Sequence, residues 1–368
     1  MKKLLVFPSE PISAYLKVGL SYEYLKDYFN PAGYFDEIYL LGIWKEVHKW
    51  ENITYIYSET NKMQNIIHGI NPIVIRAYGA YISSDLAQVS KNKGIPIIVS
   101  VHDTNQKLIH NSIKYADYII CMTEAVKKAV ESKISIKAKK IWVMPNRIDE
   151  NVMKKSYKEI FFAELNKKFP QRKHILHVGR KCEQKNLETV IKAMKYIDDD
   201  TAVIFVGRGE DSVYRKLANN CGVADRCYFV ESVNNNDLAY WYSWCDCFCT
   251  PSRWEGFGFV FIEAAACEAP IITSNIAPMN EYLTNGLDAI LVDDYENPQE
   301  IANAIKKVLC GGSEIERMCK EARKVGLNFS KSKIDEQEIS IYKEVMSNSV
   351  SSKKAPWIKR KIWERKYR

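Results

Sequence analysis

The sequence predicts an α/β protein made of two halves, each built on a doubly wound parallel sheet. Short apolar, β-branched runs alternate with longer helical patterns along the chain, which is typical of βαβ units. The length of 368 residues suits two domains. We expect strands at Leu4–Phe7, Glu37–Leu41, Ile53–Ile56, Ile73–Arg76, Ile97–Val101, Tyr118–Cys121 and Ile141–Met144, and in the second half at His174–Val178, Ala202–Val206, Cys227–Val230, Cys247–Thr250, Ile271–Thr273 and Ala289–Val292.

Helical patterns separate these runs. In the first half we expect one helix over Tyr15–Phe29 and another over Glu124–Ser132, capped by Thr123. A charged pattern at Lys154–Phe169, ended by Pro170, lies at the junction of the halves. Helices of the second half are expected at Leu187–Tyr196, Val213–Asn220, Asn236–Trp244, Phe261–Cys267, Met279–Leu283 and Pro298–Leu309. Ligands of doubly wound sheets bind at the carboxyl ends of strands, so the chemistry should lie in the loops after them.

The composition is that of a folded globular protein, with 46% hydrophobic and 27% charged residues. No window approaches the roughly eighteen apolar residues of a membrane-spanning helix. The first apolar run stops at Pro8, which is too early for the core of a signal peptide. Ten cysteines without an export signal predict free thiols in a reducing compartment, so we expect a cytoplasmic protein. Cys245, Cys247 and Cys249 alternate along a strand and are expected on one face as core thiols.

The net charge of +8 is concentrated at the C-terminus. Residues 353–368 contain eight bases and one acid, so they carry +7 and residues 1–352 carry only +1. The nearly neutral body argues against a nucleic-acid-binding surface. The tail interleaves its bases with five large apolar residues: Trp357, Ile358, Ile362, Trp363 and Tyr367.

This tail composition suits an anionic membrane surface. Around a helical wheel, however, the apolar residues spread too widely to form a narrow stripe. A nucleic-acid arm, a subunit contact and a solvated tail are the alternatives.

The segment His174–Asn186 places two cations directly after a strand. The strand ends at Gly179, and Arg180 and Lys185 follow in the loop before a helix. Two fixed cations beside a helix N-terminus form a pocket for a diphosphate. A solvated basic loop is the alternative, and the spacing alone does not decide between them.

The segment Trp254–Glu268 combines two carboxylates with two glycines. Glu255 and Glu263 are eight positions apart, with Gly256 and Gly258 between them. The glycines let backbone N–H groups approach a ligand and open a helix whose positive end favours anions. Glu263 falls inside an otherwise apolar helix, so its carboxylate should be buried and needs donors such as ribose hydroxyls. A structural hydrogen bond to a neighbouring loop is the alternative.

These segments resemble the retaining GT-B glycosyltransferases of family 4, the glycosyl transferases of group 1. Gly179–Asn186 resembles the family's Gly-Arg-four-Lys-Asn element, and Glu255 with Glu263 resembles its Glu-seven-Glu motif. Other elements follow in the family's order over about 170–345: the Gly-x-Gly of Gly207 and Gly209, the base-binding strand and loop of Asp225–Val233, and Gly286–Val292.

In the first half the resemblance is carried by Val101–Asp103, Ala116–Val126 and Met144–Asp149. The first of these contains His102 at a strand end. The family's glycine-rich loop after its first strand is replaced here by Pro8–Ala14. In the family that loop commonly lies near the donor phosphate and the acceptor.

The resemblance implies a GT-B fold, in which two Rossmann-like domains face an interdomain cleft. It implies transfer of a sugar from a UDP- or GDP-linked donor to an acceptor hydroxyl of a glycan or lipid-linked acceptor, with retention at the anomeric carbon and with no metal or other cofactor. The rivals are a sugar-nucleotide epimerase or a phosphorylase on the same fold, and a non-catalytic binding subunit that keeps the fold.

The resemblance also implies roles for site residues. Arg180 and Lys185 would stabilise the departing diphosphate, Glu255 would hold the donor sugar, and His102 would contact the sugar or the acceptor. Glu263 would hold the ribose. The nucleotide site would be completed by Gly207, Gly209, Val233, Gly256, Phe257, Gly258 and Phe259.

The expected domain organisation follows from these matches. An acceptor-side domain at 1–150 and a linker at 151–172 precede a nucleotide-sugar domain at 173–328. A closing helix at 329–346 returns to the first domain, and the basic aromatic tail occupies 347–368. We expect that tail to hold the enzyme peripherally at a membrane that carries its acceptor.

Overall fold

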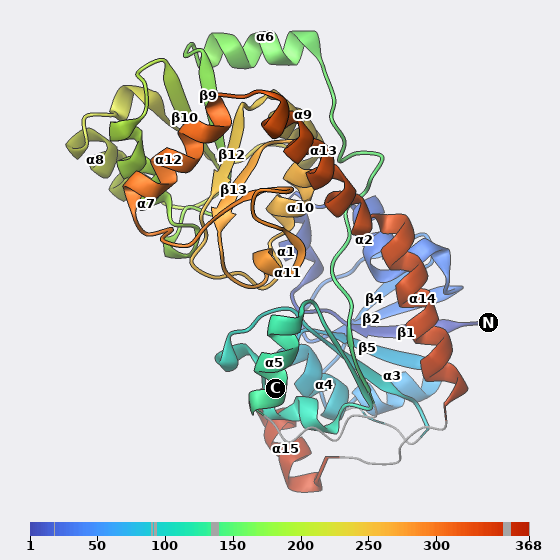
Figure 1. Cartoon of the computed structure of the whole chain (residues 1–368). Coiled ribbons are helices and arrows are strands. Elements are labelled where there is room, and N and C mark those ends of the chain that lie inside the picture. Colours follow the sequence, from blue (N-terminus) through green and yellow to red (C-terminus); the bar gives the residue numbers. More distant parts are fainter. Residues whose placement is uncertain (18, 90, 92–93, 134–139, 349–354, 368) are drawn as a thin grey trace. The chain divides into compact units, whose positions relative to one another are not determined.

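The computed structural model describes residues 1–17, 19–89, 91, 94–133, 140–348 and 355–367. The chain divides into two compact units. Unit 1 combines Met1–Pro145 with Ser332–Arg368, and unit 2 is Asn146–Lys331. Both are α/β, with helices packed around a central sheet (Figure 1). Within the described ranges, no helix is long and apolar enough to cross a membrane.

Unit 1 contains, in the part of the chain that the structure describes, an eight-stranded sheet in the order β3-β4-β2-β1-β5-β6-β7-β8. Adjacent strands of this sheet pair in parallel, except that β3 pairs with β4 in antiparallel orientation. The antiparallel edge strand β3 has two residues and was not predicted from the sequence. The strands are β1 (Lys3–Phe7), β2 (Glu37–Gly42), β3 (Lys49–Trp50), β4 (Ile53–Tyr57), β5 (Val74–Tyr78), β6 (Ile97–Val101), β7 (Tyr118–Cys121) and β8 (Lys140–Val143).

Unit 2 has a fully parallel sheet in the order β11-β10-β9-β12-β13-β14. The chain starts this sheet in the middle at β9, builds outward to β11, and then returns to the other side of β9 with β12. The order reverses between β9 and β12, which makes their carboxyl ends the topological switch point. The strands are β9 (Lys173–Val178), β10 (Thr201–Val206), β11 (Cys227–Val230), β12 (Cys247–Thr250), β13 (Ile271–Ser274) and β14 (Ile290–Val292).

The predicted strands of both halves are confirmed to within two residues at each end. The four central strands of unit 2, β9, β10, β12 and β13, are almost continuously buried and apolar, as in a sheet that is covered on both faces. Other helices of the fold include α3 (Met63–Ile70), α4 (Ile82–Val89), α6 (Glu159–Lys168), α8 (Ser212–Asn220) and α11 (Met279–Tyr282).

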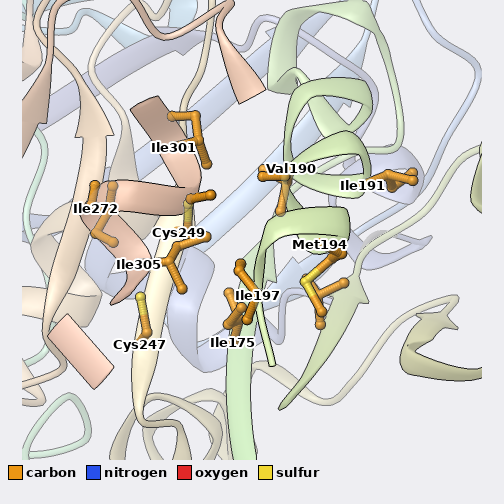
Figure 2. Packing of buried hydrophobic residues seen from close by; sticks show 14 of the residues in the cluster. Ile175, Val190, Ile191, Met194, Ile197, Cys247, Cys249, Ile272, Ile301 and Ile305 are labelled. Atoms are coloured by element: carbon orange, nitrogen blue, oxygen red, sulfur yellow. The ribbon is translucent and has the colours of Figure 1, made fainter. Parts of the chain in front are cut away.

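One face of the unit 2 sheet packs against α7 (Leu187–Ala193), α8 and α12 (Pro298–Leu309). Figure 2 shows the core of this layer, where Val190 from α7 and Ile305 from α12 meet Cys247 and Cys249 from β12. These two cysteines are core thiols on one strand face, as expected. Cys245 does not share that face, because it lies at the C-terminal end of α9 (Leu238–Trp244), where its thiol contacts the carbonyl of Tyr242. All ten cysteines are free.

Beyond these layers, α10 (Phe259–Ala266) packs closely on α13 (Ser313–Asn328). A Cβ atom on Gly326 would lie 2.6 Å from the backbone nitrogen of Ala266, so the two helices touch through their backbones. Helix α10 was predicted from the sequence, whereas α13 was not. Of the aromatic residues of α9, Trp241, Tyr242 and Trp244 are buried and Tyr240 is partly exposed.

The prediction of a single helix over Tyr15–Phe29 was wrong. The structure has α1 (Ile12–Lys17) and α2 (Tyr22–Phe29), separated by Gly19 with a φ of +91°. Ser21 then caps α2 by accepting a hydrogen bond from the backbone of Tyr24 at 3.1 Å. The predicted cap of α5 (Glu124–Lys133) is confirmed, because the hydroxyl of Thr123 accepts a bond from the backbone of Val126.

The junction helix α6 begins at Glu159 rather than Lys154. The preceding segment is held outside the helix by the side chain of Ser243, which accepts a bond from the backbone of Ser156 at 3.0 Å.

The last two helices belong to unit 1 apart from the first residue of α14 (Lys331–Ser347). Helix α14 contributes Ile341, Tyr342 and Val345 to a core cluster with β1 and β2. Glu338 of α14 forms a fully buried ion pair with Arg76 of β5 at 3.0 Å. The final helix, α15 (Trp357–Lys366), packs on α4 (Figure 1). Ser349–Ser352, Lys353, Lys354 and Arg368 of the predicted tail lie outside the described residues.

Candidate active site

The loop after β9 is shaped by residues that tolerate a left-handed backbone. Gly179 has a φ of +153° and Asn186 a φ of +52°. The side-chain oxygen of Asn186 accepts from the hydroxyl of Thr189 at 2.6 Å, and its amide donates to the carbonyl of Tyr295 at 3.0 Å. These bonds hold the end of the loop, so that Lys185 turns back toward the carboxyl end of the sheet.

Two further glycines bring the loop after β10 against the loop after β9. A Cβ atom on Gly207 would lie 2.0 Å from the carbonyl oxygen of Gly179, and one on Gly209 would lie 2.7 Å from that of Lys181. Both glycines were predicted to line the nucleotide. In the structure, both glycines let the backbones of the two loops pack directly against each other.

The amino group of Lys185 lies 2.5 Å from Oε1 of Glu255, and the two side chains are 10% and 7% exposed. The hydroxyl of Ser252 donates to the same oxygen at 2.7 Å, and the amide of Gln184 donates to Oε2 at 3.3 Å. The carboxylate therefore has partners on both oxygens, which a buried charge requires. This pair joins the loop after β9 to the loop after β12, at the switch point of the sheet.

Arg180 is exposed beside this pair. Its guanidinium donates to Oε1 of Gln184 at 3.1 Å, while the amide of Gln184 donates to the carbonyl of Trp254 at 2.8 Å. Gln184 therefore links the two loops that carry the predicted catalytic residues. Gln184 was not among the predicted site residues.

Helix α10 begins immediately after the second glycine of the Glu-Gly-Phe-Gly segment. Gly258 is its N-cap with a φ of +83°, and no side chain caps the helix. The positive end of its dipole thus faces the loop that carries Glu255. Phe257 is buried and packs on the rings of Phe259 and Phe329, with centroids 5.5 and 5.6 Å away. Its side chain anchors the loop, and Gly256 lies between this anchor and Glu255.

Glu263 is the fifth residue of α10, and its carboxylate accepts a hydrogen bond from the hydroxyl of Tyr242 at 2.9 Å. Burial raises the pKa of Glu263, and the bond from Tyr242 and the charge of Lys185 oppose that rise. Lys185 is paired with Glu255, and its charge also favours the ionised form of Glu263. Tyr242, the partner of Glu263, was not among the predicted site residues.

His177 of β9 contacts the backbone of the loop that carries Lys185. It is fully buried on β9, and its Nε2 lies 3.0 Å from the carbonyl oxygen of Lys185. Burial lowers the pKa of His177 to about 4, so the neutral imidazole donates to this carbonyl at neutral pH. It fixes the backbone that carries Lys185, and nothing in the sequence pattern separated it from an ordinary strand residue.

Lys181 is buried under the strand-end loops. Its amino group donates to the carbonyls of Gly207 and, at 3.0 Å, of Val230. It ties the loops after β9 and β10 to the end of β11. Val233, predicted to bind the nucleotide, lies in the loop that follows β11 and is partly exposed. Since β11 is the edge strand, Val233 lies farther along the sheet from the switch point than Arg180.

His102, the predicted site residue of unit 1, directly follows β6. Its ring packs edge-on against Tyr78 at 6.2 Å, and its Nε2 is buried without a hydrogen-bond partner among the described residues. Burial, with a contribution from Arg76, lowers the pKa of His102 to about 4. The ring is therefore neutral at pH 7.

The loop that replaces the glycine-rich element is closed by a carboxylate. Glu46 accepts from the backbone of Ile12 at 2.8 Å and from the hydroxyl of Ser13. Ser9 and Tyr15 share a hydrogen bond of 2.6 Å in the same segment. The backbone donor of Ile12 at the start of α1 is therefore used within the protein.

Comparison with known proteins agrees with this geometry. Residues 158–325, which include Arg180, Lys185, Glu255 and Glu263, match the family model described as Glycosyl transferases group 1. The chain carries a group 1 glycosyltransferase domain.

Similarity to known proteins extends beyond residues 158–325. The chain is 26% identical over 297 residues to an uncharacterized glycosyltransferase of Methanocaldococcus jannaschii, MJ1178, covering 77% of each chain. It is 30% identical over 160 residues to a GDP-mannose-dependent α-(1-6)-phosphatidylinositol monomannoside mannosyltransferase of Mycobacterium tuberculosis, covering 40% of this chain and 41% of that one.

A solved structure shows the same fold over nearly the whole glycosyltransferase. Anabaena Alr3699/HepE, in complex with UDP and glucose, superposes with a TM-score of 0.74 at 17% identity. The match covers 93% of this chain and 99% of that one. The fold is therefore GT-B, with two Rossmann-like α/β domains, as the sequence predicts.

Proposed function

We propose that this glycosyltransferase is a retaining enzyme that moves a sugar from a UDP- or GDP-linked donor to an acceptor hydroxyl, without a bound metal ion. The observation that carries the proposal is the buried Lys185–Glu255 pair at the switch point of unit 2. Ligands of doubly wound sheets bind at that point. The names of the relatives support the donor class, since one is GDP-mannose-dependent and a structural neighbour was solved with UDP.

The chemical task is to stabilise charge that develops on the departing diphosphate. The bond between the anomeric carbon and the phosphate oxygen breaks, and a bond to the acceptor oxygen forms on the same face. The leaving phosphate oxygen takes the acceptor proton. Arg180 and Lys185 supply fixed positive charge, and the uncapped start of α10 adds its dipole. These groups do the work that a metal ion performs in other transferases.

The two carboxylates take separate roles in this proposal. Glu263, already paired with Tyr242, has a second oxygen for a ribose hydroxyl. Glu255 is held rigidly by Lys185, Ser252 and Gln184, which suits a group that fixes hydroxyls of the donor sugar. His102 is neutral and contacts the sugar or the acceptor as a hydrogen-bonding group rather than as a cation. The acceptor belongs to a glycan or a lipid-linked glycan.

A non-catalytic binding subunit is the second candidate. The observation that favours it is the use of the Ile12 amide by Glu46, in the segment where the family carries its glycine-rich loop. The intact Arg180, Lys185, Glu255 and Glu263 favour the enzyme.

The proposal is tested by titrating the purified chain with UDP, GDP, ADP and CMP in a calorimeter, and by following the corresponding sugar donors by NMR. We expect one nucleoside diphosphate to bind, its donor to be consumed, and the anomeric signal of the product to keep the donor's configuration. Turnover in excess EDTA tests whether the reaction requires a metal ion. Binding without consumption of any donor would favour the binding subunit, and an inverted product would refute retention.

A further inference from the structure

Helix α15 is held on unit 1 by one of its sides. Trp363 packs edge-on against Tyr115 with a centroid distance of 6.3 Å, and the hydroxyl of Tyr367 donates to the buried Asp85 at 2.7 Å. The carbonyl of Glu364 accepts a bond of 3.1 Å from the hydroxyl of Thr60. The helix is therefore a docked element of unit 1, with a defined inner and outer side.

The outer side of α15 exposes large apolar side chains. Trp357 is 65%, Ile358 66% and Ile362 58% exposed. Ile358 and Ile362 are one helical turn apart. At 100° per residue they lie about 100° and about 140° around the helix from Trp357, so the three exposed side chains share the outer half of its surface. Trp363 and Tyr367 point to the other side. The wide spread of apolar residues around the helical wheel thus has a physical reason: α15 has two apolar faces with different partners.

Basic residues lie among the exposed apolar ones. At 100° per residue, Lys361 and Arg365 fall between Trp357 and Ile362 on the outer side. The described part of the tail, 355–367, contains five bases and one acid, a net charge of +4. We call Trp357, Ile358, Lys361, Ile362 and Arg365 the α15 outer face.

More positive charge surrounds the place where α15 is docked. Lys359 and Lys114 both lie over the ring of Tyr115, at 5.9 and 5.2 Å from its centroid. Lys361 is partly neutralised by Glu364, which lies 2.7 Å away, whereas Arg365 is exposed. Apolar and cationic side chains therefore lie side by side on the outer side of α15, with further positive charge at Lys359 and Lys114.

We propose that the α15 outer face docks unit 1 onto the surface of an anionic lipid bilayer. A bilayer interface accommodates exposed tryptophan and isoleucine among the acyl chains while its anionic headgroups pair with lysine and arginine. A nucleic-acid groove would use the bases but would leave the two isoleucines in water. Because the inner side of the helix is fixed on α4, docking would hold unit 1 in one orientation on the membrane. This inference does not depend on the reaction proposed above.

The test is flotation of the full chain with vesicles of phosphatidylcholine alone or mixed with phosphatidylglycerol. We expect binding to the anionic vesicles only. The triple variant Trp357→Ser, Ile358→Ser, Ile362→Ser and the double variant Lys361→Gln, Arg365→Gln should each lower the bound fraction about tenfold. All substituted positions except Lys361 are exposed, and thermal unfolding checks that the fold is kept.

A matched control removes the same number of exposed apolar residues elsewhere. Tyr157, Ile160 and Val213 of unit 2 are 74%, 72% and 69% exposed, and their replacement by Ser should leave vesicle binding unchanged. The proposal is overturned if the wild-type chain does not float, if the triple variant floats as well as the wild type, or if the control loses binding equally. Binding to a single-stranded DNA oligonucleotide but not to vesicles, or loss of self-association in the triple variant, would assign the face to those partners instead.

Discussion

Lys185 and Glu255 form a buried ion pair, 2.5 Å long, between the two strand-end loops that meet where the order of the unit 2 sheet reverses. The residues are seventy positions apart in the chain, and Ser252 and Gln184 complete the hydrogen bonding of the carboxylate. The pair fixes the position of a cation that has no side-chain freedom left to lose when a diphosphate binds. It is therefore a preorganised charge at the predicted site.

Removing one member of this pair should cost stability as well as activity. Lys185→Met or Glu255→Gln leaves the partner buried without its main contact, and we expect each to lower the free energy of unfolding by about 3 kcal/mol. The double variant should recover much of that loss, since no uncompensated charge remains. Urea denaturation of the four proteins measures this cycle.

The exposed pair of Lys324 with Glu321 is the matched control for this cycle, and its removal should change stability by less than about 1 kcal/mol. Additive effects of Lys185→Met and Glu255→Gln would show that the buried pair has no coupling.

Glu263→Gln should separate stability from ligand binding. Burial raises the folded-state pKa of Glu263 above the ordinary 4.5, so ionisation of this carboxyl destabilises the fold. Stability tied to it is full below pH 4.5 and is lost as pH rises through the folded pKa. The neutral amide can still accept from Tyr242. We therefore expect the variant to melt higher than the wild type at pH 8, with no gain at pH 4.

The same variant should bind the nucleoside diphosphate about tenfold more weakly, because a hydrogen bond to a charged carboxylate becomes one to an amide. Calorimetric titration measures the affinity. Unchanged affinity together with a lower melting temperature at every pH would make Glu263 a structural residue.

The lowered pKa of His177 predicts that the protein loses stability in mild acid. Its pKa is lowered from 6.5 to about 4 in the fold, so the unfolded chain binds the proton more readily. The contribution of the neutral ring is full above pH 6.5 and is lost as pH falls toward 4, with a magnitude on the order of 3 kcal/mol. Chemical denaturation of the wild type and His177→Gln from pH 7.5 to 4.5 should show a flatter profile for the variant. The exposed His68→Gln is the control, and parallel profiles for wild type and His177→Gln would disprove the assignment.

Gly207→Ala tests the close approach of the two loops. Its Cβ atom would lie 2.0 Å from the carbonyl oxygen of Gly179, so the loop that carries Arg180 has to move. Gly222 also has a positive φ, +70°, but no atom lies within 4 Å of its Cβ position. Gly222→Ala should therefore lose only about 1 kcal/mol of stability and keep nucleotide binding. Gly207→Ala should weaken nucleotide binding strongly, and equal behaviour of the two variants in titration would contradict the packing role.

The sequence predicts the strands of this protein well because each is a short, apolar, β-branched run between helices. It fails where a single residue changes the local backbone, as at Gly19, which separates α1 from α2. Arg180, Lys185 and Glu255 lie in the loops after β9 and β12, where the switch-point rule places a site, whereas Val233 lies farther along the sheet. Gln184 and Tyr242 were missed because their partners lie 70 and 21 positions away in the chain, which no local spacing encodes. Ser252 is only three positions from Glu255, but its bond depends on the turn of the loop between them.

The tail shows a related limit. Its residues form a helix with two apolar faces, and a helical wheel alone does not distinguish the face that Tyr115 and Asp85 occupy from the one left outward. Packing of the tail on unit 1 supplies that distinction.

The most direct test of the central claim is the release of nucleoside diphosphate from UDP-glucose and GDP-mannose by the wild-type chain and by Lys185→Met, compared with Lys195→Met as an exposed control. We expect the wild type and the control to consume one donor at the same rate, and Lys185→Met to be slower by about a hundredfold or more with its fold retained. Equal rates for Lys185→Met and the wild type would contradict the role of the buried pair at the reacting diphosphate.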